Sequence, residues 1–391
     1  MTWPERIILS AYLLAGVVTW LLFIFVMVKG RKRMTLLHRP GFSLPPDPPL
    51  ISVLVPARDE AGQIEQCLQS ILRQDYPRFE LVVIDDRSTD GTGEILDRMA
   101  AGDRRIKVVH LTHRELPQGW GGKSYALHQG LSQAAGQWLL FVDADVQLEP
   151  DVLSQSLAVA VKREFDLVSL LPRFVGADFW ERLLQPLAGA ATSAMFLIAL
   201  TNSNESKVAF ANGQFLLVKR AAYDAVGGHE AIRGTLSEDV AVARRLKAAG
   251  FRPRLGWADG WASVRMYAGL GEVFRGWSRN FYVGSLGRPW RILGLLAFLA
   301  VCWLSMFVAA AWGIARPSAA WLTAAGAHFA AMTWALVLMY RWSGNPWWNA
   351  LLFPIGAAVL VAISVKALWI CATGKVQWRG TTYTRGTLRQ A

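Results

Sequence analysis

The stretch WLLFVDADVQ at residues 138–147 decides the fold expected of this chain. Residues 138–142 form a run of large apolar side chains, which is typical of a buried strand. Asp143 and Asp145 follow where that strand ends, and their i, i+2 spacing puts both carboxylates on one side of the chain. Carboxylate oxygens are hard ligands that suit Mg²⁺ or Mn²⁺. We therefore expect a divalent cation here, with a pair of solvated turn aspartates as the alternative.

Strands and helices alternate on the N-terminal side of this stretch. Short apolar runs at residues 51–55, 80–84 and 106–110 predict three more strands. A helix is expected at residues 61–73, and a further helix ends near residue 100. Another is expected at residues 123–135, directly before the strand at residues 138–142. This alternation predicts an α/β domain built on a mostly parallel, doubly wound sheet.

Polar residues gather where these strands end, which is where such sheets bind their ligands. Glu60 follows the first strand closely, and Asp85 and Asp86 follow the second. Neither GxGxxG after a strand nor GxxxxGK[ST] is present, so a dinucleotide fold and a P-loop are disfavoured. Carboxylates in place of glycine loops favour a metal that holds a diphosphate. For Asp85 and Asp86 a plain turn is the alternative, because residues 87–91 are good turn and cap chemistry.

Long apolar blocks show that the chain is a membrane protein with a large soluble body. The 391 residues are 53% hydrophobic and 18% charged, which is too apolar for an average soluble enzyme. Four blocks are long enough to cross a hydrocarbon core of about 30 Å, at residues 7–28, 292–315, 317–340 and 349–371. Residues 50–290 read instead as water-soluble.

Basic residues predict the orientation of the first block. Lys29, Arg31, Lys32 and Arg33 follow it, which places that end in the cytoplasm by the positive-inside rule. A cleaved signal peptide is the alternative, although its basic cluster would precede the apolar run. Three C-terminal spans would put the tail outside, whereas its basic residues argue for inside, so one block is open to an interfacial or re-entrant reading.

The charge and the cysteines narrow the partners and the compartment. The net charge of +12 fits an anionic membrane face, and without zinc-finger spacing or a long basic helix we expect no nucleic-acid partner. Cys67, Cys302 and Cys371 form no CxxC pair, which fits a reducing compartment for the soluble part.

Five motifs in order resemble the GT-A glycosyltransferases of family 2. They are residues 55–60 (VPARDE), 85–88 (DDRS), 122–123 (GK), 143–145 (DAD) and 237–239 (SED). The resemblance covers about residues 50–285. Further likeness at residues 119–123, 228–234 and 265–280 is to membrane-anchored carotenoid (chlorobactene-type) and hopanoid-associated lipid glycosyltransferases.

This resemblance implies an inverting transfer from a nucleotide-diphosphate sugar, and it implies roles for individual residues. On the donor side it implies that Asp86 accepts from the base, Lys123 approaches the diphosphate and Asp143 lies near the ribose. It also implies that Pro56, Ala57 and Glu60 line the nucleoside pocket. The metal, Mg²⁺ or Mn²⁺, is implied to bind Asp145 and Gln147. Asp239 matches the general base, with Glu238 beside it in the catalytic set.

The residues themselves support a base at Asp239. Inversion needs a carboxylate that takes the acceptor's proton, and residues 237–239 open a helical run at 240–249. We expect the helix dipole to keep a carboxylate there ionised. A plain N-cap by Ser237 is the alternative.

One departure from the family concerns polymerising members, which carry a QxxRW motif after the base. Here Arg279 is followed by Asn280, which favours a single transfer. Arg275, Trp277 and Arg279 are still expected to close over the sugar diphosphate as donor-binding residues, with an interfacial helix and snorkelling arginines as the alternative.

We therefore expect a family 2 hexosyltransferase of the plasma membrane, multi-pass and with its catalytic domain in the cytoplasm, that glycosylates a hydroxyl of an apolar lipid. A polyprenyl-phosphate sugar synthase and a non-catalytic scaffold are the alternatives. The expected parts are an anchor (1–33), a Pro-rich linker (34–49), the GT-A domain (50–285, with an interface helix near 179–200), about three C-terminal transmembrane helices (286–371) and a basic tail (372–391).

Overall fold

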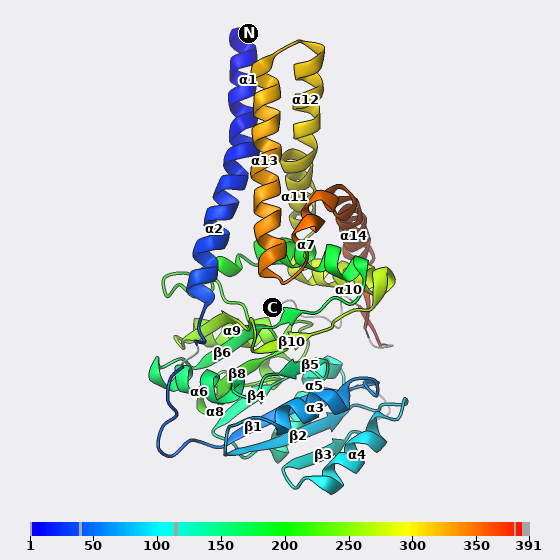
Figure 1. The fold of residues 1–391 in the computed structure, drawn as a ribbon. Helices are drawn as coiled ribbons and strands as arrows, with labels where there is room; N and C mark the ends of the chain where they lie inside the picture. The colour runs from blue at the N-terminus through cyan, green and yellow to red at the C-terminus, as the bar shows by residue number, and fades with distance from the viewer. Residues whose placement is uncertain (1, 39–40, 113–115, 379–380, 385–391) are drawn as a thin grey trace. The chain divides into compact units, whose positions relative to one another are not determined.

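A computed structural model describes residues 2–38, 41–112, 116–378 and 381–384. Its internal contacts divide the chain into two units. Unit 1 comprises residues 1–32, 176–195 and 267–373, and unit 2 comprises residues 33–175, 196–266 and 374–391. The long apolar helices belong to unit 1 and the sheets belong to unit 2 (Figure 1).

Unit 2 is built on a sheet that has seven strands in the described residues, in the order β3-β2-β1-β4-β8-β6-β9. Neighbouring strands are parallel except for β8, which is antiparallel to both β4 and β6. The expected mostly parallel sheet is therefore confirmed. The strands are β1 (Ile51–Ala57), β2 (Phe79–Asp85), β3 (Ile106–His110), β4 (Trp138–Phe141), β6 (Leu167–Leu171), β8 (Leu216–Lys219) and β9 (Pro253–Trp257).

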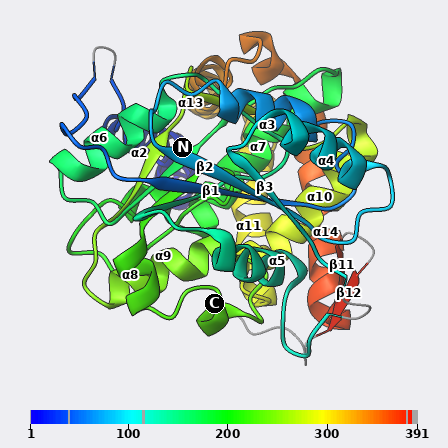
Figure 2. The same ribbon diagram turned by 90° about the horizontal axis from the view of Figure 1, so that it is seen from below.

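Helices cover both faces of this sheet (Figure 2). One face carries α3 (Ile64–Leu72), α4 (Thr92–Gly102) and α6 (Val152–Lys162), and the other carries α5 (Gly122–Gly130), α8 (Arg220–Ala225) and α9 (Glu238–Ala248). Alternate residues of β1 supply the two cores: Val53 and Val55 pack on the α3 side and Leu54 on the α5 side. Because both faces are covered, the strands are continuous apolar runs.

Within the described residues, unit 2 also contains two smaller β-structures. In the first, β5 (Val146–Leu148), β10 (Ala262–Val264) and β7 (Arg173–Phe174) form a sheet in that order, so β5 begins directly after Asp145. In the second, β11 (Lys375–Trp378) and β12 (Thr381–Thr384) pair antiparallel. Most basic residues of the expected tail, Arg379, Arg385 and Arg389, lie outside the described residues.

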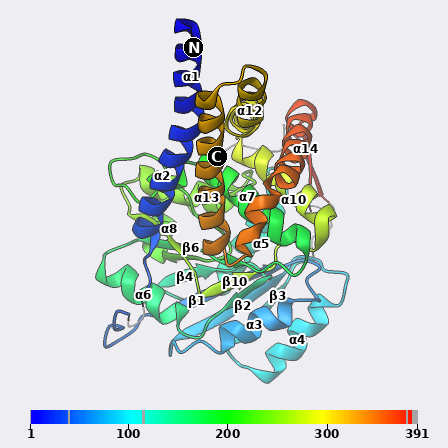
Figure 3. The same ribbon diagram turned by 45° about the horizontal axis from the view of Figure 1, so that its top comes forward.

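Within the described residues, four helical segments are long and apolar enough to cross a membrane: Trp3–Met34, which belongs to unit 1 as far as residue 32, and Pro289–Ala315, Ala319–Trp342 and Trp347–Thr373, which lie in unit 1. Three of them contain expected blocks, and Ala319–Trp342 begins two residues after the start of the block expected at residues 317–340. Their elements are α1 (Trp3–Leu13), α2 (Thr19–Met34), α11 (Pro289–Leu299), α12 (Ser305–Ala315), α13 (Ala319–Trp342) and α14 (Phe353–Thr373). Helices α12 and α13 pack along each other (Figure 3).

Two further helices, α7 (Phe179–Met195) and α10 (Gly269–Gly284), group with the apolar helices of unit 1, although we expected both within the catalytic domain. The hydroxyl of Tyr340 on α13 donates to the carbonyl of Leu183 on α7 at 2.8 Å. Gly356 of α14 packs closely on α7, since a Cβ there would lie 2.4 Å from Leu187. The apolar face of α7 therefore packs against these helices. Helix α7 ends at Met195, short of the expected residue 200.

Candidate active site

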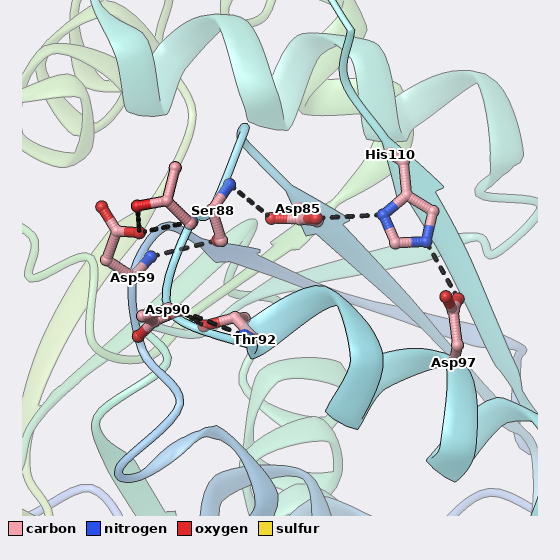
Figure 4. A network of polar contacts seen from close by, with 8 residues as sticks. Asp59, Asp85, Ser88, Asp90, Thr92, Asp97 and His110 are labelled. Atoms are coloured by element: carbon pink, nitrogen blue, oxygen red, sulfur yellow. Dashed lines mark hydrogen bonds and ion pairs between the residues drawn. The ribbon is translucent and has the colours of Figure 1, made fainter.

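Two loops at the carboxyl ends of β1 and β2 are tied together by short polar contacts (Figure 4). Asp59, whose φ is 54°, accepts a hydrogen bond from the Thr89 backbone N–H at 2.8 Å. Its own N–H donates to the hydroxyl of Ser88 at 3.1 Å, and the Ala61 N–H donates to Asp90 at 2.9 Å. The two motifs at residues 55–60 and 85–91 thus form one cradle.

Asp85 serves the structure of this cradle. Its Oδ1 accepts from the Ser88 N–H at 3.0 Å, and its Oδ2 lies 3.0 Å from Nδ1 of His110. The other ring nitrogen of His110 lies 2.9 Å from Asp97 on α4. Asp97 and Asp85 together raise the pKa of His110, because both stabilise its charged form. These contacts are consistent with the plain-turn alternative for Asp85, which also contacts β3 through His110.

Asp86 is buried and paired with arginines. Its Oδ1 lies 2.8 Å from Nε of Arg87, and its Oδ2 lies 3.9 Å from Nη1 of Arg58. Its backbone N–H donates to the Ala57 carbonyl at 2.8 Å, which joins the ends of β1 and β2. The sequence interpretation missed both arginine contacts. Pro56, Ala57, Glu60 and Asp86, the residues assigned to the nucleoside, all lie on these two adjacent strand ends.

Lys123 joins the donor motifs to the expected base. Its Nζ, in the first turn of α5, lies 2.6 Å from Oδ1 of Asp143 after β4 and 2.7 Å from Oε1 of Glu238 at the start of α9. Burial by itself lowers the pKa of Lys123, but the carboxylates of Asp143 and Glu238 outweigh it and raise that pKa. The ammonium is therefore charged at neutral pH.

Asp239 is held by two backbone N–H groups. Its Oδ2 accepts from Gly213 at 2.8 Å and its Oδ1 from Val240 at 2.7 Å, while Ser237 makes no capping hydrogen bond. Burial and the adjacent Glu238 raise the pKa of Asp239 to about 7. The helix dipole, which we expected to keep this carboxylate ionised, is outweighed. A carboxyl with a pKa near 7 suits general base catalysis at neutral pH.

These side chains surround one small cavity of about 10 Å³, which is room for about one water molecule. Lys123, Asp143, Gly213, Glu238 and Asp239 all line it. The sequence assigned Lys123 and Asp143 to the donor, and Glu238 and Asp239 to the catalytic set. The structure brings these residues together around one cavity.

His229 also lines this cavity. Its Nδ1 lies 2.5 Å from the Tyr223 hydroxyl, and the same hydroxyl accepts from the His229 N–H at 2.8 Å. Burial and the nearby charge of Lys123 lower the pKa of His229 to about 3, so the ring is neutral. A neutral, doubly anchored histidine supports the wall of the site.

Asp145 fits a divalent cation. Its Oδ1 is buried and has no hydrogen-bond partner among the described residues, which is costly for a carboxylate unless a cation binds it. Burial, Asp143 and Glu60 raise the pKa of Asp145 to about 7, so its surroundings favour added positive charge. In the described part of the chain no three acidic, His or Cys side chains gather to hold a metal. The cation would therefore rest on few protein ligands together with donor phosphates.

Gln147, the second expected metal ligand, is exposed on β5, and its amide donates to Oε1 of Gln66 at 3.0 Å. Arg275, Trp277 and Arg279 lie on α10 in unit 1, where Trp277 is buried beside Tyr267 and Phe281. Their assignments to the metal and to the donor stay predictions.

Comparison with known proteins identifies the domain. Residues 52–227 match the model of the family described as Glycosyl transferase family 2. The chain carries a family 2 glycosyltransferase domain. Its motifs at residues 55–60, 85–88, 122–123 and 143–145 all fall inside the matched region. The chain is accordingly an enzyme that transfers a sugar from a nucleotide sugar.

Two relatives of this glycosyltransferase carry names that refer to lipids. The 4,4'-diaponeurosporenoate glycosyltransferase of Staphylococcus haemolyticus is 28% identical over 265 residues, which are 66% of this chain and 68% of that protein. The beta-monoglucosyldiacylglycerol synthase of Nostoc sp. is 30% identical over 202 residues, which are 51% of this chain and 41% of that protein.

A solved structure shares the GT-A fold with this glycosyltransferase. It is a mannosyltransferase from Pyrobaculum calidifontis in complex with GDP-Man and Mn²⁺, 20% identical, with a TM-score of 0.51 over 92% of this chain and 99% of that one. The expected fold class is thereby confirmed.

Proposed function

We propose that the chain moves a single sugar from a nucleotide-diphosphate sugar to a hydroxyl of an apolar lipid, with inversion at the anomeric carbon. The observation that carries the proposal is the Lys123 ammonium, which bridges Asp143 of the donor motif and Glu238 beside Asp239. Donor-binding and base chemistry therefore meet at one point of unit 2.

In this reaction Asp239 removes the proton from the acceptor hydroxyl as it attacks. Its two backbone hydrogen bonds fix the carboxylate, and its pKa of about 7 makes it a competent base near neutrality. Lys123 offers its third N–H to the departing diphosphate. A divalent cation on Asp145, as the Mn²⁺ of the Pyrobaculum neighbour supports, would neutralise the phosphate charge.

The lipid acceptor and the membrane setting rest on unit 1 and on the relatives. Four helices of unit 1 are long and apolar enough to span a membrane, and both relatives are named for lipid products or acceptors. A catalytic domain on the cytoplasmic side of the plasma membrane is supported by the basic residues that follow the first span, Lys29, Arg31, Lys32 and Arg33.

The test is mass spectrometry of lipids from cells with and without the gene, and from cells with the Asp239→Asn variant. We expect one lipid class to gain a single hexose only with the unaltered enzyme. A hexose on a water-soluble product, or an identical lipid profile in all three strains, would contradict the proposal.

A carboxylate or phosphate acceptor is the second candidate, because the name of the staphylococcal relative denotes a carboxylate and the polyprenyl-phosphate alternative also has an anionic nucleophile. An anionic acceptor needs no general base. Retention of turnover in Asp239→Asn would therefore favour that candidate over a hydroxyl.

A further inference from the structure

A second cavity in unit 2 shares no lining residue with the candidate active site. Its volume is about 460 Å³, inside the range of about 300–1,000 Å³ typical of small-ligand sites. Three arginines line it, Arg33, Arg163 and Arg254, against a single acidic residue among the described lining, Glu205. The cavity therefore favours an anion.

Arg254 is the buried centre of this cavity, with 7% of its surface exposed. Its guanidinium lies 5.0 Å from the ring centroid of Phe165, donates to the Pro253 carbonyl at 2.9 Å and also donates to Asn204. A guanidinium has five N–H donors. In the described part of the chain only two of these are engaged, which leaves donors for the oxygens of a phosphate.

Hydrogen bonds hold polar residues that line this cavity in place. The side-chain amide of Asn202 donates to the Leu255 carbonyl at 2.7 Å and to the Arg33 carbonyl at 3.2 Å, and its oxygen accepts from the Leu255 N–H at 2.8 Å. Behind it, Nζ of Lys247 donates to the carbonyl of Ser203 at 2.9 Å. These bonds hold the cavity's loop in place without any ligand.

The covalent chain ties one lining residue of the cavity to the first candidate span. Arg33 lies in the last turn of α2, which continues the candidate span Trp3–Met34. The apolar run ends at Val28, and five further helical residues advance about 7 Å. The headgroup layer extends about 5–8 Å beyond the hydrocarbon on each side. In a membrane crossed by this span, Arg33 would therefore lie level with the lipid phosphates.

We propose that this cavity binds the phosphate headgroup of an anionic phospholipid from the membrane in which the chain is anchored. Free phosphate has the same recognition chemistry, but the position of Arg33 favours the lipid. The binding is independent of the proposed transfer reaction, and it is read out without any sugar donor.

The test uses the full-length protein in detergent, labelled for thermophoresis and titrated with dioctanoyl phosphatidylglycerol, dioctanoyl phosphatidylcholine or inorganic phosphate. The cavity variant combines Arg33→Gln with Arg163→Gln, which leaves buried Arg254 in place for folding. The control combines Arg98→Gln with Arg104→Gln, which removes the same charge from unit 2 at exposed positions that do not line the cavity.

We expect phosphatidylglycerol to bind the unaltered protein and the control with equal affinity, and the cavity variant about tenfold more weakly, as expected for lost charge-assisted hydrogen bonds. Equal affinity in the cavity variant and the control would overturn the proposal. Equal binding of phosphatidylcholine would overturn the anionic preference, and equal binding of inorganic phosphate would overturn the lipid as the source. The melting temperature of each variant verifies that it is folded.

Discussion

At the scale of single residues, Lys123 contacts two carboxylates to which we assign different steps of the proposed reaction. It holds Asp143, on the donor side, and Glu238, beside the base. Removing one partner of a buried pair leaves an uncompensated charge, which costs about 3–5 kcal/mol. A donor diphosphate that draws on the same ammonium therefore changes the charge felt by Asp239, which couples donor binding to the state of the base.

Asp239→Asn is expected to lower turnover by on the order of 10²–10⁴, the usual range for a lost general base, with little change in donor affinity. The amide keeps the shape of the side chain but cannot take a proton. Turnover is measured with labelled donor and affinity by calorimetry. The exposed Glu94→Gln serves as the matched control with full activity. A parallel loss of donor binding would reassign Asp239 to the donor site.

The pH dependence follows from the pKa of about 7 at Asp239. Burial raises this pKa, so the carboxyl is protonated, and useless as a base, below about pH 7. We expect kcat to rise with pH through an apparent pKa near 7 and then to level off. Raising the Mg²⁺ or Mn²⁺ concentration should leave this apparent pKa unchanged, because we assign Asp239 to the base and not to the metal. A flat profile from pH 5.5 to 8 would contradict the assignment.

Asp145→Asn is expected to abolish activity while the protein still folds. The buried Oδ1 of Asp145 makes no hydrogen bond within the described part of the chain, so we expect the fold not to depend on it, whereas a bound cation would. Calorimetry should show metal-dependent donor binding in the unaltered protein and its loss in the variant, with an unchanged melting temperature. Full activity of the unaltered enzyme in excess EDTA would refute this role.

At the scale of elements, the loop before β8 brings its backbone against the site. A Cβ on Gly213 would lie 2.8 Å from Nζ of Lys123 and 3.4 Å from Oε1 of Glu238. We expect Gly213→Ala to push the flexible lysine aside and to lower turnover about tenfold, the cost of about 1.4 kcal/mol at the transition state, with little change in melting temperature. Gly102→Ala, where a Cβ meets open space, is the control. Unaltered turnover in Gly213→Ala would show that the position of Lys123 is not critical.

Much of the sheet was predictable from sequence because local signals specify it. The apolar runs at residues 51–55 and 106–110 became β1 and β3, and the aspartates at 143 and 145 do follow a strand. The pairing of antiparallel β8 between β4 and β6 depends on contacts far apart in the chain, and no local signal marks it. The same holds for Lys123 and Glu238, which are ion-paired although they lie 115 positions apart in the chain.

At the scale of the whole molecule, several polar groups of the apolar helices join one helix to another. The Tyr12 hydroxyl lies 2.9 Å from Nδ1 of His328, whose Nε2 lies 3.0 Å from the Cys302 carbonyl. Trp20 donates to that same carbonyl at 2.9 Å. These bonds join three of the candidate spans to one another. His328 therefore acts as a helix-packing residue, and the polar groups in these bonds are already engaged between the helices.

This arrangement bears on whether the enzyme makes a chain of sugars. A growing glycan carries hydroxyls, each of which costs about 2–7 kcal/mol if left unpaired in hydrocarbon. Helices α12 and α13, within the described residues, present mainly apolar side chains and would not line a conduit for it. Arg279 is also followed by Asn280 instead of Trp. We therefore expect a product with one sugar.

Membranes incubated with labelled donor should yield, on chromatography, one lipid band whose intensity grows with time. A ladder that lengthens with time, or label in a water-soluble polymer, would contradict both the single transfer and the lipid acceptor.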